Sequence, residues 1–152
     1  MTRRRWLALA LLAGCGGGSG AGTDDSAPSL LPATYQQSFV QVRDCRESID
    51  HGLVHIVIKT EPALAQRYDR GPFPLPVGAV VLKEEFSDAA CAALTGWTLM
   101  RKEAAGYDPP HGDWHWQRLD AGGRVLLDGK LATCASCHAA ACRARDFTCA
   151  EP

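Results

Sequence analysis

Residues 134–138 read Cys-Ala-Ser-Cys-His, and this run carries the most specific chemistry in the chain. C-x-x-C-H is the attachment motif of a c-type haem. Two thiols three positions apart, on one helical turn, can form thioether bonds to the two vinyl groups of the porphyrin. His138 then falls under the iron, where its imidazole can act as the proximal ligand. The motif therefore predicts one covalent haem c, held by Cys134 and Cys137 and ligated by His138.

Two other readings of the same cysteines are a thiol redox pair and half of a zinc site. A zinc site needs a second pair of ligands, and the later Cys142 and Cys149 do not have the required spacing. A thioredoxin-type redox pair would be surrounded by a βαβ pattern, which this sequence lacks. Both alternatives fit the sequence less well than haem attachment does.

The N-terminus has the pattern of an export signal. Three arginines at 3–5 precede an apolar stretch at 6–13, which is too short to span a bilayer as a mature helix. The segment closes with Leu-Ala-Gly-Cys at 12–15, which resembles a bacterial lipobox. We therefore expect a lipoprotein signal peptide at 1–14, a lipid on Cys15 and a flexible Gly/Ser-rich tether at 15–33. The alternative is ordinary secretion with Cys15 as an incidental thiol.

Both interpretations predict that the protein is exported. The lipoprotein interpretation also predicts an anchor at the outer membrane, facing the periplasm. Disulfides persist in that compartment. Four of the seven cysteines remain after lipid and haem attachment, and we expect them to pair as Cys45–Cys91 and Cys142–Cys149. Two other pairings, or buried free thiols, are the alternatives.

Charge argues against a nucleic-acid partner. The whole chain has 16 Lys and Arg against 17 Asp and Glu, and removal of the three signal arginines leaves a net charge of −4. No basic stripe remains on which a phosphate backbone could lie.

The region from 34 to 152 reads as one β-rich domain. Strands are expected at 53–59, 77–86, 97–103, 113–119 and 124–127. Helices are expected at 61–68, where Pro62 suits the first turn, at 87–94, where Ser87 and Asp88 could cap a short helix, and along the haem segment at 129–145. This order differs from small c-type cytochromes, which are mostly helical, with the motif near the N-terminus and a methionine ligand downstream of it.

The sixth coordination position has no obvious ligand. Neither of the two methionines, Met1 and Met100, follows the haem motif. The histidines at 51, 55, 111 and 115 could each supply one, although a solvated or hydrogen-bonded role is the simpler expectation. On the strand at 113–119, alternation places His115 and Gln117 on the wetter face and Trp114 and Trp116 on the packed face.

The order of these blocks resembles the cytochrome P-460 family, whose relatives include the cytochromes c′-beta. The resemblance covers most of 34–152 and is carried by 56–68, 78–84, 112–114, the haem motif and 146–147. It implies an α+β, β-rich fold, in which a small antiparallel sheet with flanking helices carries a C-terminal c-type haem segment, in a homodimer. It also implies a five-coordinate haem that binds nitric oxide or oxidises hydroxylamine.

Lys83 lies where the family has a lysine that is linked covalently to the porphyrin. The period of two along its strand gives a separate reason for interest, because Val77, Ala79, Val81 and Lys83 share one face. If that face lies on the haem, Lys83 lies over or beside the macrocycle. The alternative is a surface lysine whose stem covers the end of an apolar row.

The family's distal proton acceptor has no counterpart here. A glutamate precedes the corresponding turn in cytochromes P-460, and Pro110 stands at the matching position. Asp108, His111 or Asp113 could replace it, because loss of protons from hydroxylamine needs a base nearby. Each of the three also has an ordinary explanation as a turn or surface residue.

Two functions therefore stand as expectations. The first is a haem protein that binds or oxidises small nitrogen species at an open iron, with turnover left unassigned because of Pro110. The second is a membrane-tethered electron carrier with a six-coordinate haem and no substrate. Both imply a redox partner protein.

Overall fold

The computed structural model describes residues 27–48 and 51–149. The expected signal peptide, the expected lipid site at Cys15 and most of the expected tether lie outside these residues. Within them, none of the helices is long and apolar enough to cross a membrane.

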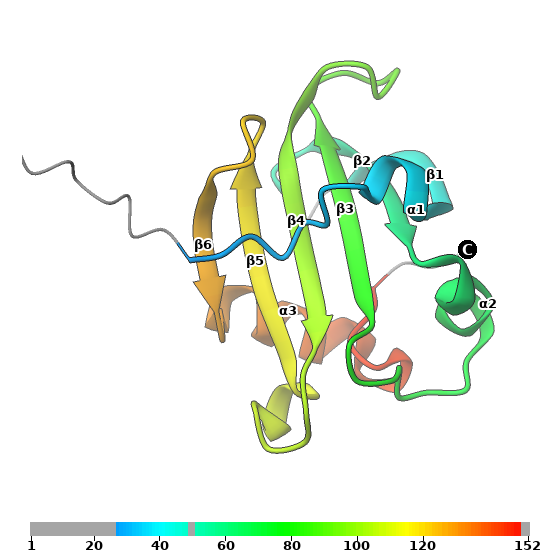
Figure 1. Cartoon of the computed structure of the whole chain (residues 1–152), viewed down its shortest axis with the longest axis vertical. Coiled ribbons are helices and arrows are strands. Elements are labelled where there is room, and N and C mark those ends of the chain that lie inside the picture. Colours follow the sequence, from blue (N-terminus) through cyan, green and yellow to red (C-terminus); the bar gives the residue numbers. More distant parts are fainter. Residues whose placement is uncertain (1–26, 49–50, 150–152) are drawn as a thin grey trace, which may run out of the picture.

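The core of the molecule is one antiparallel sheet of six strands, which lie side by side in chain order (Figure 1). The expectation of a β-rich α+β fold with a small antiparallel sheet is confirmed. The strands are β1 (Val40–Ser48), β2 (Val54–Thr60), β3 (Val80–Phe86), β4 (Leu94–Lys102), β5 (Trp114–Asp120) and β6 (Val125–Gly129).

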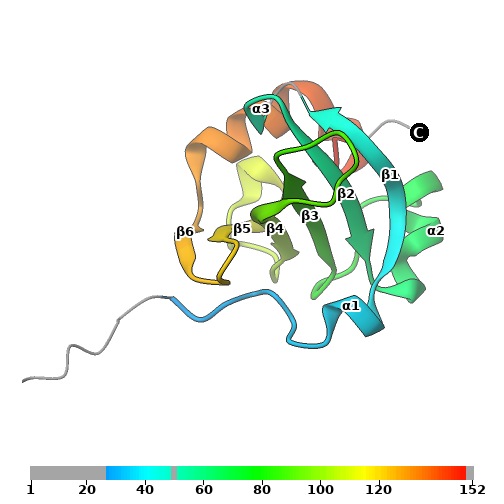
Figure 2. The ribbon, with the colours of Figure 1, turned by 90° about the horizontal axis from the view of Figure 1, so that it is seen from above.

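Helices lie on both sides of this sheet. Helix α3 (Ala132–Cys142) carries the Cys-Ala-Ser-Cys-His run and lies across one face, followed by the short η3 (Arg143–Arg145) (Figure 2). The short α1 (Tyr35–Ser38) lies on the opposite face. Helix α2 (Pro62–Arg70) begins at Pro62, as expected, and packs beside β1, and η2 (Pro109–His111) forms part of the β4–β5 connection.

Alternation along β3 divides the apolar side chains between two clusters. Val80 and Leu82 point to the face covered by α1, where they pack with Tyr35 and Trp97. Val81 belongs to the cluster on the α3 side, which also contains the following buried side chains: Ile56, Ile58, Tyr68, Met100, Trp114, Trp116, Ala135 and Phe147. The central strand β3 is therefore buried on both faces, whereas the edge strands β1 and β6 are largely exposed.

Gln117 corrects one expectation about β5. It is 1% exposed rather than on the wetter face. Its side-chain amide donates to the carbonyl of Pro28 at 3.0 Å, and its oxygen accepts from the backbone N–H of Leu30 at 2.6 Å. The chain before α1 thus crosses this face of the sheet and replaces the water that an exposed glutamine would bind.

Both expected disulfides are present. Cys45 of β1 is bonded to Cys91 in the β3–β4 connection, and Cys142 at the end of α3 is bonded to Cys149. The helix expected at 87–94 is absent. The carboxylate of Asp88 does accept backbone N–H bonds, from Ala90, Ala92 and Ala93, but it organises a turn rather than a helical start.

Candidate functional site

A cavity of about 920 Å³ lies between α3 and the sheet. Its volume is near the upper end of what small-molecule and cofactor sites have, about 300–1,000 Å³. One part of the wall is apolar and comes mainly from Val54, Ile56, Ile58, Val81, Met100 and Trp116. Another part is charged or polar and comes from Arg46, Glu47, His51, Lys83, Glu85 and Arg118. The cavity therefore suits a molecule with a large apolar body and polar groups.

Helix α3 brings all three residues of the haem motif to this cavity. Cys134 and Cys137 lie about one turn apart, both line it, and neither is in a disulfide. Burial raises the pKa of the Cys134 thiol above its usual value. The two sulfurs thus belong to the same wall and both remain reduced, as attachment of a haem requires.

His138 is held in one orientation by the backbone. Its Nδ1 lies 2.6 Å from the carbonyl oxygen of Phe147, and the residue is 7% exposed. Because a carbonyl can only accept, Nδ1 carries the proton, and Nε2 of the neutral ring has the lone pair. A ligating histidine almost always donates its other N–H in this way.

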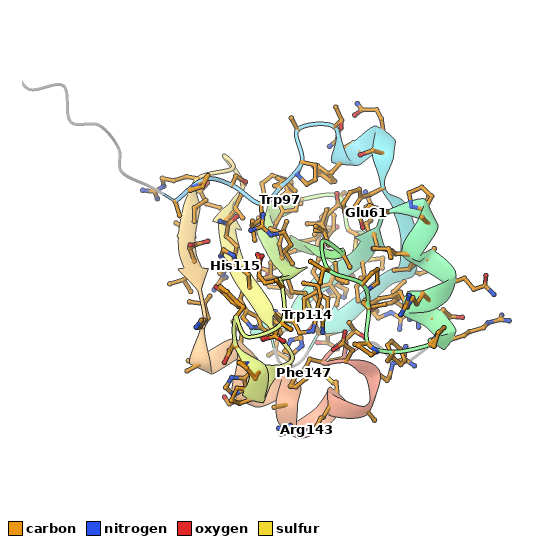
Figure 3. All side chains as sticks on the ribbon, turned by 60° about the horizontal axis from the view of Figure 1, so that its bottom comes forward. Glu61, Trp97, Trp114, His115, Arg143 and Phe147 are labelled. Atoms are coloured by element: carbon orange, nitrogen blue, oxygen red, sulfur yellow. A yellow bond between two sulfur atoms is a disulfide. The ribbon has the colours of Figure 1, made fainter. Side chains whose placement is uncertain are left out.

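The turn that supplies this carbonyl is itself anchored by a buried ion pair. The ammonium of Lys102 lies 2.6 Å from Asp146, whose other oxygen accepts from the N–H of Leu75. The carbonyl of Asp146 accepts from Nε1 of Trp114 at 2.8 Å. Trp114 and Phe147 belong to the same apolar cluster, and both are labelled in Figure 3. Sheet residues therefore fix the position of the oxygen that orients His138.

Lys83 lies on the cavity wall together with Val81, two residues before it on β3. It stands in one row across the sheet, in which each residue pairs with the next: Ile58, Lys83, Thr98, Arg118 and Leu127. All five line the cavity. The alternation that singled out Lys83 in the sequence thus brings it to the same space as the haem motif.

A polar cluster surrounds Lys83. Nε2 of His51 lies 3.2 Å from its Nζ, and Nδ1 of His51 lies 3.6 Å from Oε1 of Glu85. The other oxygen of Glu85 lies 3.5 Å from the guanidinium of Arg118. Burial tends to raise the pKa of Glu85, but its interactions with His51 and Arg118 outweigh this and hold the pKa below its ordinary value. Glu85 is therefore an anion at neutral pH.

Sequence reasoning did not identify Glu85. The available signal was its position two residues after Lys83, which places it on the same face of the strand. The sequence does not distinguish His51 from the other three histidines outside the haem motif. Of the five histidines in the chain, His51 and His138 alone line the cavity.

The rings of these two histidines lie near each other and near Trp116. The His51 and His138 centroids are 6.5 Å apart with planes at 81°, and the Trp116 ring lies 4.6 Å from that of His138. Nε1 of Trp116 is buried and has no hydrogen-bond partner among the described residues. A buried indole N–H usually has a partner, so an acceptor on a bound molecule would satisfy it.

The three expected proton acceptors do not reach the cavity. Asp108 and His111 are bonded to each other at 3.0 Å in the β4–β5 connection. Asp113 accepts from the backbone N–H groups of Gly106 and Asp108. None of the three lines the cavity. The structure brings Glu85 and His51 there instead.

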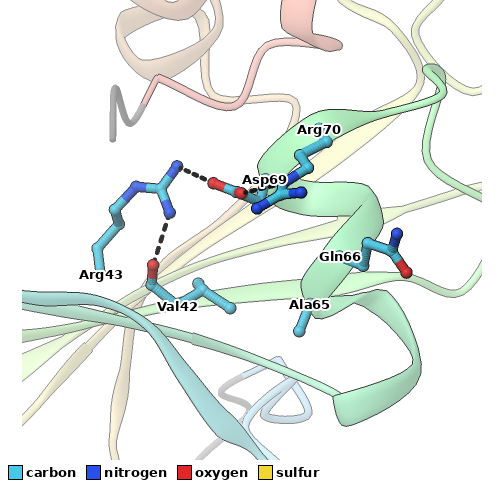
Figure 4. Close-up of a pocket in the computed structure, with 6 residues that line it drawn as sticks. All are labelled: Val42, Arg43, Ala65, Gln66, Asp69 and Arg70. Atoms are coloured by element: carbon cyan, nitrogen blue, oxygen red, sulfur yellow. Dashed lines mark hydrogen bonds and ion pairs between the residues drawn. The ribbon is translucent and has the colours of Figure 1, made fainter.

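A second hollow, of about 460 Å³, lies between β1 and α2 (Figure 4). Asp69 is paired there with Arg43 at 3.0 Å and with Arg70 at 3.2 Å. Hydrogen bonds from Arg70 and Arg43 hold the pKa of Asp69 below its usual value. The carboxylate is thus an ion-pair partner, and the described residues that line the hollow include no cysteine, histidine, serine or threonine.

The cavity at α3 fits a covalently attached haem. A covalently attached haem needs two thiols one turn apart, an oriented imidazole and an apolar wall, and the cavity has all three. The buried N–H of Trp116, which has no partner among the described residues, is a further group that a bound molecule could satisfy. Across residues 27–48 and 51–149, no three His, Cys, Asp or Glu side chains gather as a metal-binding group. A zinc site at Cys134 and Cys137 therefore has too few ligands in this region, whereas a haem needs only one from His138.

Comparison of the chain with models of known protein families finds no match, and a search among curated proteins finds none either.

Proposed function

We propose that this protein is an exported c-type haem protein that binds or oxidises small nitrogen species, such as hydroxylamine or nitric oxide. One haem is attached through Cys134 and Cys137 and ligated by His138. The observation that carries the proposal is that these three side chains line one large cavity, with Nδ1 of His138 held by the Phe147 carbonyl. The bound haem supplies the redox chemistry and the site at which a small ligand binds.

The residues around the cavity have separate tasks in this proposal. Phe147 orients the imidazole of His138, and the apolar wall excludes water from the macrocycle. Arg118 and Arg46 are the cations on the polar wall suited to the haem propionates. Lys83 and Glu85 supply an amine and a carboxylate on the same wall for proton transfer to and from a ligand.

The choice of nitrogen species depends on the resemblance to the cytochrome P-460 family and is supported by the position of Lys83 on the wall of the cavity that the haem motif also lines. The lipid anchor on Cys15 and the outer-membrane location are part of the same proposal and depend on the N-terminal sequence. A homodimer and a redox partner protein are its further components.

Electron transfer without a substrate is the second candidate. The observation in its favour is the short separation of the His51 and His138 rings, 6.5 Å. If both histidines held the haem iron, no site would remain for an outside ligand, and the group would supply electron transfer alone.

The test is expression of the full chain with a c-type haem maturation system. We expect the denatured protein to retain the mass of one haem, Cys134→Ala/Cys137→Ala to lose it, and the unrelated Cys45→Ala/Cys91→Ala to keep it. Nitric oxide should then change the absorption spectrum, and hydroxylamine should reduce a dye acceptor in the presence of the holoprotein. Absence of covalent haem from the wild-type chain would overturn the proposal.

A further inference from the structure

His51 occupies a place in the cavity that no other histidine outside the haem motif shares. His55, His111 and His115 do not line it. His51 comes from the connection between β1 and β2, and His138 comes from α3, so the cavity brings together two histidines that are far apart in the sequence.

The separation of the two rings matches that of two imidazoles on one metal ion. A histidine nitrogen lies about 2.0–2.1 Å from a first-row metal, so two ligating rings on opposite sides have centres roughly 6 to 6.5 Å apart. The observed distance is 6.5 Å, with the planes nearly perpendicular at 81°. The distance between the rings therefore suits a single ion between them once Nε2 of His51 turns from Lys83 toward that ion.

The neighbours of His51 set its tautomer. The Glu85 carboxylate beside Nδ1 can only accept, and it favours a proton on that nitrogen. The ammonium of Lys83 beside Nε2 can only donate, so Nε2 has the lone pair. A carboxylate behind one nitrogen and a lone pair on the other is the arrangement of a metal-bound histidine. His138 has the same arrangement, with the Phe147 carbonyl in place of Glu85.

We propose that His51 is an internal sixth ligand of the haem iron and that an outside ligand must displace it to bind. Binding of His51 exchanges its hydrogen bond with Lys83 for a bond from Nε2 to iron, with no change in oxidation state and no proton lost. Lys83 and the iron therefore compete for one lone pair, and Lys83 favours the open form. This inference depends on the proposed haem attachment at Cys134 and Cys137.

The first test is the ferric absorption and electron paramagnetic resonance spectrum of the full-length holoprotein. A low-spin, six-coordinate spectrum is expected for the wild type. His51→Ala should become high-spin, and added imidazole should restore the low-spin form. His55→Ala, two strand positions past the connection and outside the cavity, should leave the spectrum unchanged.

Ligand binding gives a second readout. If fewer than one wild-type molecule in ten has an open iron, removal of His51 should strengthen apparent cyanide affinity by roughly tenfold or more. Lys83→Met, which removes the competing donor, should keep the low-spin spectrum and weaken cyanide binding. The Lys83→Met variant tests the role of His51 even if His51→Ala does not acquire haem.

A high-spin wild-type spectrum, or a His51→Ala spectrum identical to the wild type, would overturn the role of His51 while leaving haem attachment intact. Denatured wild-type protein without bound haem would instead contradict the function proposed above. The mass measurement and the spectrum therefore separate the two failures.

Discussion

The ammonium of Lys102 and the carboxylate of Asp146 form a buried ion pair with a separation of 2.6 Å, and their side chains are only 8% and 5% exposed. The pair joins the end of β4 to the turn that follows α3. Lys102 also lies over the ring of Trp114, 4.9 Å from its centre. The position of the Phe147 carbonyl, and hence the orientation of His138, depends on this contact.

Asp146→Asn should destabilise the protein strongly. Asparagine has nearly the same size and tolerates the left-handed backbone at this position, where φ is 52°. The substitution nevertheless leaves the Lys102 charge buried without an anion, which costs about 3–5 kcal/mol. Urea unfolding measures the loss. Arg124→Met breaks the exposed Arg124–Asp120 pair and should cost no more than about 1 kcal/mol. Equal losses in the two variants would contradict this prediction.

Gly112→Ala tests the contact between the β4–β5 connection and Phe147. A Cβ at Gly112 would lie 2.5 Å and 2.7 Å from two ring carbons of Phe147, and φ is +70°. Gly106 also has a positive φ, +97°, but a Cβ there meets nothing within 4 Å. Both alanines have backbone strain of about 1–2 kcal/mol, whereas overpacking adds about 1–3 kcal/mol only at Gly112. The unfolding temperature of Gly112→Ala should therefore be lower than that of Gly106→Ala. The reverse order would contradict a packing cost at Gly112.

The two disulfides should differ in their effect on stability. The Cys45–Cys91 bond joins residues 46 positions apart, and the Cys142–Cys149 bond joins residues 7 apart. Constraint of the unfolded chain predicts about 4 kcal/mol for the longer loop and about 2 kcal/mol for the shorter one. Urea unfolding of the Cys45→Ala/Cys91→Ala and Cys142→Ala/Cys149→Ala proteins compares them. A larger loss from the second pair would show that strain or native contacts dominate.

Asp88 should make stability depend on pH in the acid range. Backbone hydrogen bonds, the largest from Ala93, lower the pKa of its carboxyl in the folded protein. A lowered folded pKa gives stability that is present above the unfolded pKa and is lost as the pH falls through the folded value. Asp88→Ala should therefore be less stable than the wild type at neutral pH, and the difference should shrink below about pH 4. Urea unfolding of both proteins at neutral and acid pH measures this, and a difference that stays the same at both pH values would contradict the prediction.

The face of a helix or strand on which a residue lies can be predicted from the sequence where local periodicity determines it. The helical spacing of Cys134, Cys137 and His138 and the alternation of Val81 and Lys83 agree with the side chains that line the cavity. The expected row began too early, because β3 starts at Val80 and Val77 is exposed. Strand β1 was missed because it is a polar edge strand, in which only Arg43 is buried, and its pairing with β2 includes register shifts. Its stability comes from a neighbour, which a local pattern does not contain.

Roles that depend on distant contacts could not be predicted in the same way. Asp113 looked like an available carboxylate, but its oxygen is used by the N–H groups of its own turn. Glu85 is on the predictable face of β3, yet its charge state depends on His51 and Arg118, which arrive from other parts of the chain. Strand alternation alone places Gln117 on the wetter face, because no feature of the β5 sequence indicates that residues 28–30 cross this strand.

The order of strands has a consequence for how the molecule assembles. Among the described residues each strand pairs only with its neighbours in chain order, so most of the sheet can form from partners that are close in the sequence, and only β2 and β3 are separated by an α-helix, α2. The helix with the two thiols is the last large element and follows all six strands. We therefore expect the sheet, which is one wall of the cavity, to form first. The cavity is enclosed only once residues 132–149 have docked on the sheet. Cys137 remains exposed and Cys134 half-buried after docking, so the enclosed space still leaves both thiols within reach of solvent.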